Sequence, residues 1–162
     1  MNIEQLKQNL TDGSYDSALS KLYGTDPDVL NQQRARYLQA AETFSRLYPE
    51  RSEVSVFSAP GRTEIGGNHT DHQHGCVLAA SVNLDVIAIV AFHQDGVIRL
   101  QSAGYPQDYV ELQDLSVHSE EKGTSAALIR GIVSRFQEMG VTTGGFDAYT
   151  TSNVLGGSGL SS

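Results

Sequence analysis

The segment VNLDVIAIVAF, residues 82–92, decides the predicted fold. Apolar residues alternate along it, with Val90 and Phe92 on one face, which is the pattern of a strand. Ile87 and Ile89 face the other way, so the second half of the strand is expected to be covered on both sides. The segment therefore predicts a strand in the interior of a sheet.

Two further strands are predicted next to this segment. Asp95-Gly96 is the dipeptide of a tight type I′ turn, so VIRLQSAG, residues 97–104, is expected to pair with residues 82–92 in a hairpin. Upstream, VSVF at residues 54–57 alternates and is rich in β-branched residues. The turn signal SAPG that follows is expected to end this strand.

Two long helices are predicted from the helical spacing of apolar residues. One spans residues 30–48, with Asp26 as its N-cap and Pro27 at its first position. The other spans residues 124–140 and ends at Gly140. Helices and strands in this order predict an α+β fold with a mixed or antiparallel sheet backed by helices.

The last predicted strand, residues 145–151, brings two polar side chains onto one face. Asp147 and Tyr149 are expected to lie on the solvated face of this strand. Cys76 precedes the apolar run VLAASV, so it is expected to pack in the interior as a small apolar residue.

Composition and charge narrow the function classes. The 162 residues are 39% hydrophobic and 19% charged, which is typical of a soluble globular domain. A formal net charge of −8 argues against binding nucleic acid, whose phosphates need a basic surface, but not against binding one nucleotide. The single cysteine indicates a reducing compartment, the N-terminus lacks the apolar core of a signal peptide, and no apolar run is long enough to span a bilayer. A cytoplasmic protein without a membrane partner is therefore expected.

A loop dense in polar residues, GRTEIGGNHTDHQH at residues 61–74, follows the first strand and admits three interpretations. One is a solvated polar loop. Another is a metal site, although four ligands crowded into a glycine-flanked loop cannot all converge on one ion without strain. The third is a pocket for a polyhydroxylated ligand, because Arg62 is held at the end of a strand near carboxylate, amide and imidazole groups that both donate and accept hydrogen bonds. The candidate metal ligands are His69, Asp71, His72 and His74.

A glycine- and serine-rich segment, LGGSGLSS at residues 155–162, follows the last strand. Its glycines let the backbone approach a ligand closely, and its serines add hydroxyl donors. A strand, a glycine-rich loop and a helix N-terminus form an anion site, so the segment predicts a phosphate loop. It lacks the lysine of the Walker pattern, and a flexible glycine-serine turn is the alternative. The sequence stops where the helix should begin, so the chain is expected to be a fragment of a longer protein.

Together the two loops resemble the galactokinases, members of the GHMP family of small-molecule kinases. The sugar signature of that family, APGRVNLIGEHTDY, is similar to APGRTEIGGNHTDH at residues 59–72, and its phosphate loop, PxGSGLSSSA, is similar to LGGSGLSS. The resemblance covers about residues 50–162. It implies that residues 51–162 form a truncated N-terminal GHMP-kinase domain, similar to ribosomal protein S5 domain 2, preceded by a helical segment at residues 1–50.

The activity that the resemblance implies is transfer of the γ-phosphoryl group of ATP to the anomeric hydroxyl of galactose, with Mg²⁺ as cofactor. Phosphoryl transfer depends mainly on positioning and on positive charge, which suits Arg62 as a catalytic residue at both the sugar and the transferred group. The implied sugar-binding residues are Arg62, Asn68, His69 and Asp71. The implied ATP-binding residues are Gly156, Gly157, Ser158, Gly159, Leu160, Ser161 and Ser162, with Ser162 also near Mg²⁺.

Several positions depart from the family pattern, and four of these departures matter for the alternatives that stay open. Glu64 replaces an asparagine, Asn68 a glutamate, His72 a tyrosine and Leu155 a proline. An asparagine both donates and accepts where a glutamate only accepts, so a kinase for a related sugar such as N-acetylgalactosamine is one alternative. A sensor that binds sugar and ATP without useful catalysis is another. The family's catalytic aspartate lies beyond the phosphate loop, so the chain alone is expected to be inactive and to need the missing C-terminal half as its partner.

Overall fold

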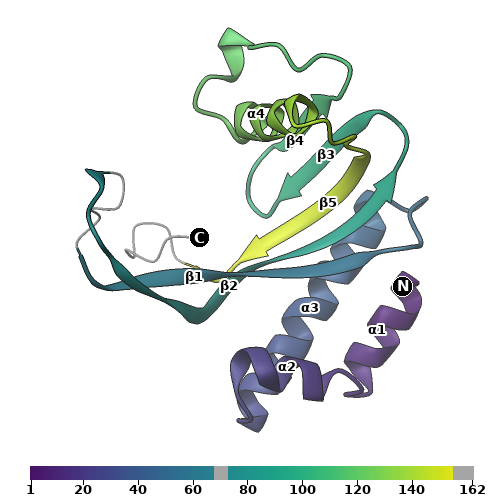
Figure 1. The fold of residues 1–162 in the computed structure, drawn as a ribbon. Coiled ribbons are helices and arrows are strands. Elements are labelled where there is room, and N and C mark those ends of the chain that lie inside the picture. The colour runs from purple at the N-terminus through teal and green to yellow at the C-terminus, as the bar shows by residue number, and fades with distance from the viewer. Residues whose placement is uncertain (68–72, 155–162) are drawn as a thin grey trace.

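The computed structural model describes residues 1–67 and 73–154, and within these ranges a five-stranded mixed sheet lies at the centre of the fold (Figure 1). The strand order across the sheet is β1-β2-β5-β3-β4. β3 and β5 run parallel, and the other neighbouring strands run antiparallel. The predicted α+β fold with a mixed sheet is confirmed. The strands are β1 (Ser55–Gly66), β2 (Leu78–His93), β3 (Val97–Ser102), β4 (Gln107–Glu111) and β5 (Gly145–Ser152).

Helices lie on both sides of this sheet. The helices from the start of the chain lie on one side, and α4 lies on the other side, against β3 and β4 (Figure 1). None of the described helices is long and apolar enough to cross a membrane. The helices are α1 (Ile3–Thr11), α2 (Asp16–Tyr23), α3 (Pro27–Leu47) and α4 (Ser125–Glu138), with a short 3₁₀ turn, η2 (Ser119–Glu121), ahead of α4.

Both long helices begin and end close to the predicted positions, and the predicted N-cap at Asp26 and the predicted stop at Gly140 are confirmed. The Asp26 carboxylate accepts a hydrogen bond from the N–H of Asp28 at 2.9 Å and so caps α3. Thr124 Oγ1 accepts one from the N–H of Ala127 at 3.3 Å and caps α4 in the same way. Gly140, with φ of +77°, follows the end of α4 in the left-handed conformation that glycine permits.

The main core forms between α3 and one face of β2. Ile87 and Ile89 are completely buried on this face, and Ala91 is nearly so. The residues of α3 that pack there are buried at helical spacing: Tyr37, Ala40, Ala41 and Phe44. On the opposite face Val90 is buried but Phe92 is 65% exposed, so the expectation that this half of β2 is covered on both sides is only partly correct. α4 covers only the part of that face formed by β3, β4 and the start of β5.

The predicted hairpin between β2 and β3 is wrong, because β5 lies between these two strands. Gly145, the first residue of β5, pairs with His93 at the end of β2. A Cβ atom at Gly145 would overlap the carbonyl oxygen of Val97 and lie 2.8 Å from His93 Cε1. Only a glycine leaves room for β5 to enter between β2 and β3 at this point.

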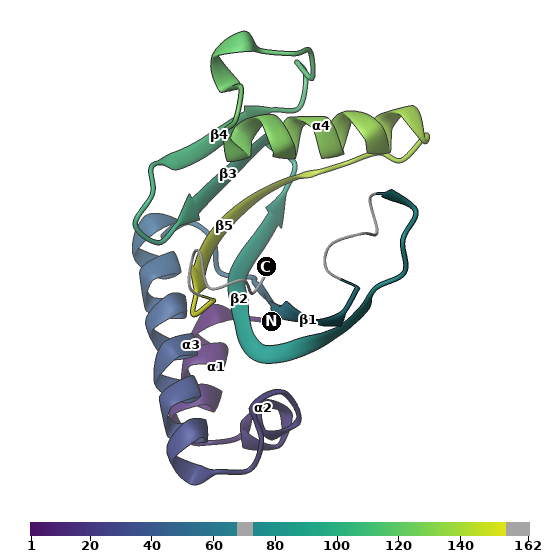
Figure 2. The ribbon, with the colours of Figure 1, turned by 90° about the vertical axis from the view of Figure 1, so that its left-hand side faces the viewer.

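β1 does not end at the SAPG turn signal, as the sequence predicts, but continues to Gly66. It is an edge strand, and its register against β2 shifts between Pro60 and Arg62. Proline is tolerated at such a place because an edge strand or a bulge does not require its missing N–H. The second half of β1 and the first half of β2 extend beyond the other strands as a curved two-stranded ribbon (Figure 2).

Cys76 lies just before the start of β2, and its side chain is exposed. The expectation that it packs in the interior is therefore wrong. The apolar run that follows it belongs to the extended ribbon, where burial is incomplete, rather than to the core.

Candidate functional site

The segments that lead into the two predicted loops meet at one end of β5. Gly61, in the APGR sequence of β1, lies against Val154, which follows β5. A Cβ atom added at Gly61 would lie 3.2 Å from Val154 Cγ2 and 3.2 Å from Val82 Cγ2. Two segments that are far apart in the sequence are therefore in direct contact, and only a very small residue fits between them.

Arg62 is the first predicted site residue along the chain, and its side chain is accessible to a ligand. The side chain is 44% exposed, and its Nη2 lies 3.3 Å from Oε1 of Glu64, whose side chain is 13% exposed. Glu64, which departs from the family pattern, is thus a partner of the arginine. An exposed guanidinium with one carboxylate partner retains donors for an anionic or polyhydroxylated ligand.

The other predicted site residues lie outside the described residues. On the sugar side these are Asn68, His69 and Asp71, together with His72. On the phosphate side they are Leu155, Gly156, Gly157, Ser158, Gly159, Leu160, Ser161 and Ser162. Of the four candidate metal ligands only His74 is described, so the metal interpretation stays a prediction. Within residues 1–67 and 73–154, no group of three or more His, Cys, Asp or Glu side chains could hold a metal ion.

A polar cavity of about 310 Å³ lies beside Val154, on the path to the predicted phosphate loop. Much of its wall carries hydroxyl groups, which donate and accept hydrogen bonds. The residues around it include Val86, Ser102, Tyr105, Thr150, Thr151 and Ser152. Space for part of a polar ligand therefore exists next to the point where β5 ends.

Behind this junction lies a buried polar group that we name the Asp85 cluster: Asp85, Tyr23, Arg36, Tyr37, Ser58 and Asn153. Asp85 is 2% exposed. Its carboxylate accepts hydrogen bonds from Tyr23 Oη at 2.5 Å, from Arg36 Nη1 at 2.6 Å and from Ser58 Oγ. The Tyr37 hydroxyl lies 2.8 Å from that of Tyr23, at hydrogen-bond distance. Helices α2 and α3, together with Ser58 of β1, thus supply the hydrogen-bond donors to a buried carboxylate of β2.

These partners keep Asp85 ionised. Burial by itself raises the pKa of the Asp85 carboxyl, but the hydrogen bonds from Ser58, Tyr23 and Arg36 outweigh burial and bring the pKa below its ordinary value. Burial, followed by the bond to Asp85, raises the pKa of the Tyr23 hydroxyl well above its ordinary value. The tyrosine therefore stays a hydrogen-bond donor and the aspartate stays an acceptor.

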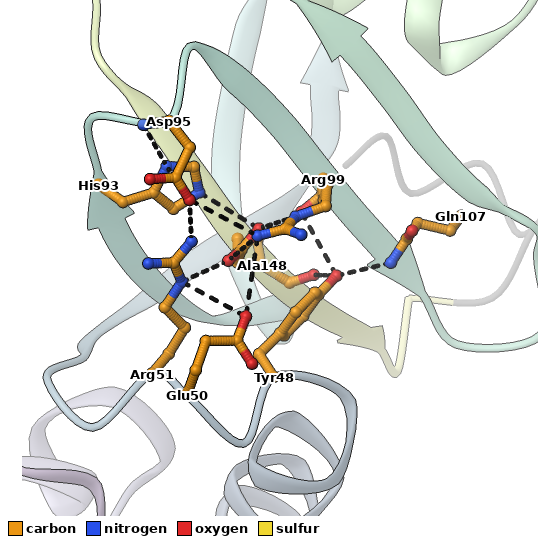
Figure 3. A network of polar contacts seen from close by, with 9 residues as sticks. Tyr48, Glu50, Arg51, His93, Asp95, Arg99, Gln107 and Ala148 are labelled. Carbon is orange, nitrogen blue, oxygen red and sulfur yellow. Dashed lines mark hydrogen bonds and ion pairs between the residues drawn. The ribbon is translucent and has the colours of Figure 1, made fainter.

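A second buried carboxylate lies near the other end of β5, in the Asp147 cluster: Asp147, Arg51, His93, Asp95 and Arg99 (Figure 3). The Asp147 side chain is fully buried, so the expectation that it lies on a solvated face is wrong. Arg99 donates to it through Nε at 2.6 Å and through Nη2 at 2.8 Å, and Arg51 Nε donates at 2.7 Å.

Sequence reasoning missed both clusters, although one signal for the first is visible. Asp85 interrupts an otherwise apolar strand, and a charge inside such a run must find a partner when it is buried. Nothing near Asp85 in the sequence identifies that partner. Arg36 and Tyr23 precede it by many residues and reach it only because α2 and α3 pack against this face of the sheet.

Comparison with known proteins agrees with this geometry. Residues 42–92, from the end of α3 through β1 and most of β2, match the family model for the galactokinase galactose-binding signature. A galactokinase from Streptomyces coelicolor is 37% identical over 123 residues, which are 75% of this chain and 31% of that protein. The chain is related to the galactokinases. A galactokinase from Bacillus subtilis is 29% identical, over 74% of this chain and 31% of that protein.

Solved structures give the same relation. The structure of Lactococcus lactis galactokinase complexed with galactose matches with a TM-score of 0.66 and 25% identity, over 75% of this chain and 32% of that chain. A mevalonate kinase from Methanococcus jannaschii shares the fold, with a TM-score of 0.52 and 14% identity, over 67% of this chain and 35% of that chain. The predicted resemblance to the galactokinases and the predicted GHMP-kinase fold are therefore confirmed. The chain spans about a third of the length of the galactokinases it matches.

Proposed function

We propose that the protein carrying this chain transfers the γ-phosphoryl group of ATP to the anomeric hydroxyl of galactose. The observation that carries the proposal is the contact between Gly61 and Val154. It places the strand that bears Arg62 beside the segment that runs into residues 155–162, so a sugar held by one loop would lie near a phosphate held by the other. Bringing two reactants together in this way supplies much of the catalysis of phosphoryl transfer.

The sugar side of the site is formed by Arg62, Asn68, His69 and Asp71 in this proposal. All four lie within the residues that match the galactose-binding signature. Guanidinium, amide, imidazole and carboxylate groups offer the mixture of donors and acceptors that neighbouring sugar hydroxyls require. A galactokinase that matches this fold was solved in complex with galactose, which supports the same ligand class for this chain.

The nucleotide side is formed by Gly156, Gly157, Ser158, Gly159, Leu160, Ser161 and Ser162 in this proposal. Backbone N–H groups freed by glycines, together with three serine hydroxyls, are a donor set that fits a triphosphate. A hydroxyl oxygen such as that of Ser162 is also a ligand type that Mg²⁺ accepts, and Mg²⁺ when bound neutralises charge on the phosphate oxygens. The polar cavity offers room beside Val154, which precedes this segment in the sequence.

Arg62 has the catalytic role in this arrangement. Its guanidinium stabilises the negative charge that develops on the transferred phosphoryl oxygens, and its planar fork also orients the sugar. Its partner Glu64 accepts a hydrogen bond from Nη2 at 3.3 Å, and a ligand would compete for the same donor.

Calorimetry with galactose tests the sugar site. We expect the protein to bind galactose and Asp71→Ala to abolish detectable binding, because each unmet hydrogen bond in a buried polar pocket costs about 1–3 kcal/mol. Asp28→Ala, at an exposed aspartate of α3, is the matched control and should bind normally. Equal affinity in the wild type and in Asp71→Ala would remove Asp71 from the site. Tighter binding of N-acetylgalactosamine than of galactose would change the assigned substrate.

A coupled ADP-release assay separates the enzyme from a sensor. We expect galactose-dependent ADP release from the protein expressed from its complete reading frame, in the presence of Mg²⁺ and ATP. Binding of both ligands without turnover would identify a sensor instead. If a chelator abolished galactose binding in the absence of nucleotide, and zinc restored it, the metal interpretation of His69, Asp71, His72 and His74 would replace the sugar pocket.

A further inference from the structure

The β1–β2 ladder is irregular directly before Arg62. Pro60 pairs with Asp85, but Arg62 pairs with Ser81, so the single residue Gly61 lies opposite residues 82–84 of β2. Bulges of this kind bend a strand and change the direction of the side chains that follow. The extra residues are on β2, and Arg62 is the first residue of β1 that pairs with β2 again after them, so the position of Arg62 against β2 depends on this irregularity.

Asp85 borders this bulge and connects it to the rest of the fold through its carboxylate. One partner, Ser58, is on β1 itself, three residues ahead of Gly61. The other carboxylate partners, Tyr23 and Arg36, come from α2 and α3. The helices therefore hold both strands of the ladder at the position where its register changes.

The backbone of Asp85 is tied to the other loop. Its N–H donates to Oδ1 of Asn153 at 2.7 Å, and its carbonyl oxygen accepts from the N–H of Asn153 at 3.1 Å. Arg36 Nη2 donates to that same carbonyl oxygen at 2.9 Å and to the carbonyl oxygen of Thr151 at 3.3 Å. Asn153 directly precedes Val154, so Asp85 also determines where the segment after β5 begins.

We propose that Asp85 is a positioning residue that sets the placement of Arg62 relative to the segment beginning at Val154. The identity of the two ligands concerned rests on the proposed function, whereas the positioning itself does not. Asp85 is buried and acts through the bulge at Gly61 and through Asn153 rather than by touching a ligand. Through Tyr23 and Arg36, the helices of the N-terminal segment take part in aligning the site.

The matched control is Asp147→Asn, because Asp147 is an equally buried carboxylate of the same sheet whose hydrogen bonds, within residues 1–67 and 73–154, come from Arg51 and Arg99 rather than from β1 or Asn153. In Asp85→Asn we expect the amide hydrogens of Arg62 and Val154, followed by NMR, to exchange about tenfold faster or more. Galactose affinity should fall by about tenfold, because a displaced Arg62 would lose about one hydrogen bond from its charged guanidinium to the sugar. Because both substitutions also lower global stability, exchange at Arg62 and Val154 is measured relative to exchange at Ile89 in the core of β2. Relative to that reference, Asp147→Asn should leave exchange at Arg62 and Val154, and the galactose affinity, within about twofold of the wild type.

A second pair of variants keeps the test decisive if Asp85→Asn does not fold. Ser58→Ala removes one partner of Asp85 and should reproduce part of both effects, whereas Ser58→Thr keeps the hydroxyl and should restore wild-type values. Unchanged exchange at Arg62 and Val154 in Asp85→Asn and Ser58→Ala, or equal changes in Asp147→Asn, would overturn the proposal. Wild-type protein that binds no galactose would overturn the proposed function instead, and the exchange comparison would still decide the role of Asp85.

Discussion

The Asp85 cluster and the Asp147 cluster place two buried carboxylates on the same face of the sheet, one near the middle of α3 and the other beyond its C-terminal end. Asp147 pairs with Ala91, about 20 Å farther along β2 than Asp85 at the spacing of strand residues. Arg36 of α3 reaches Asp85, and Arg51, just beyond the end of α3, reaches Asp147. One helix therefore spans the distance between two charged sites in an otherwise apolar core.

The two clusters differ in what their partners are attached to. Asp147 is held mainly by charge, through two arginines with His93 close by, and its partners come from segments that bind no proposed ligand. Asp85 has one arginine, and its other carboxylate partners are the neutral hydroxyls of Ser58 and Tyr23. The comparison indicates that the Asp147 cluster stabilises one end of the sheet, whereas the Asp85 cluster aligns the loops at the other end.

The largest effect is expected from Asp147→Asn, measured by urea unfolding. The free energy of unfolding should fall by about 3–5 kcal/mol, because breaking a buried ion pair leaves the arginines without their charged partner in the interior. Asp95→Asn, at a carboxylate of the same cluster that is half exposed, is the control and should have a much smaller effect. Equal losses from the two substitutions would mean that burial of Asp147 does not matter.

Arg62→Lys and Arg99→Lys compare one arginine from each end. Lysine keeps the charge but cannot make the forked contact of a guanidinium. Arg62→Lys should lower kcat by about thirtyfold with little change in KM, since its role is in the transition state. Arg99→Lys should lower the melting temperature and leave kcat unchanged, because Arg99 contacts Asp147 with both Nε and Nη2. A normal kcat with a raised KM in Arg62→Lys would limit that residue to substrate binding.

Features that depend on neighbouring residues along the chain, such as helix ends and single strands, could be predicted from the sequence. The cap at Asp26 and the stop at Gly140, with the helical spacing of apolar residues, identified α3 and α4, and the alternating residues of β2 identified a strand with two apolar faces. Which strands pair depends on contacts between distant residues. The hairpin prediction failed because Gly145 admits β5 beside His93, and no signal next to Asp95-Gly96 reveals that.

The same limit applies to the site. The polar loop and Arg62 were identifiable from their residue types, but the SAPG turn signal hid the fact that β1 continues through Arg62 to Gly66. The contact between Gly61 and Val154 was not, because it depends on β5 lying next to β2. Asp147 was placed on a solvated face because alternation separates two faces without showing which one Arg51 and Arg99 will cover.

Gly61→Ala tests the junction with a single methyl group. The added carbon would lie 3.2 Å from both Val154 and Val82, so the neighbours must move and the unfolding free energy should fall by about 1–3 kcal/mol. Gly66→Ala is the matched control on the same strand, since a Cβ atom there meets none of the described residues within 4 Å. We expect only Gly61→Ala to weaken galactose binding. Weakened binding in both variants would point to a general effect on β1 rather than to the junction.

The smallest difference between the two clusters is expected in the pH dependence of stability, because protonation of either carboxylate destabilises the folded protein. Burial by itself raises the pKa of each aspartate. Hydrogen bonds outweigh burial and bring both pKa values below the ordinary value. These bonds come from Arg99 and Arg51 for Asp147, and from Ser58, Tyr23 and Arg36 for Asp85. The unfolded chain then binds protons at a higher pH than the folded protein does. The stability that these carboxylates contribute is present above about pH 4 and is lost as the pH falls through the lower, folded-state pKa values.

Urea unfolding at a series of pH values between neutral and strongly acidic measures this loss. Wild-type protein should lose stability steeply as the solution is acidified, and both Asp85→Asn and Asp147→Asn should flatten the curve, because an amide cannot take up the proton. Asp147→Asn should flatten it more, since two guanidinium groups hold Asp147 ionised and only one holds Asp85. A flatter curve in Asp85→Asn than in Asp147→Asn would reverse the comparison and make the Asp85 cluster the stronger electrostatic site. The pH profile of kcat supplies an independent check, because Asp147→Asn should leave that profile unchanged.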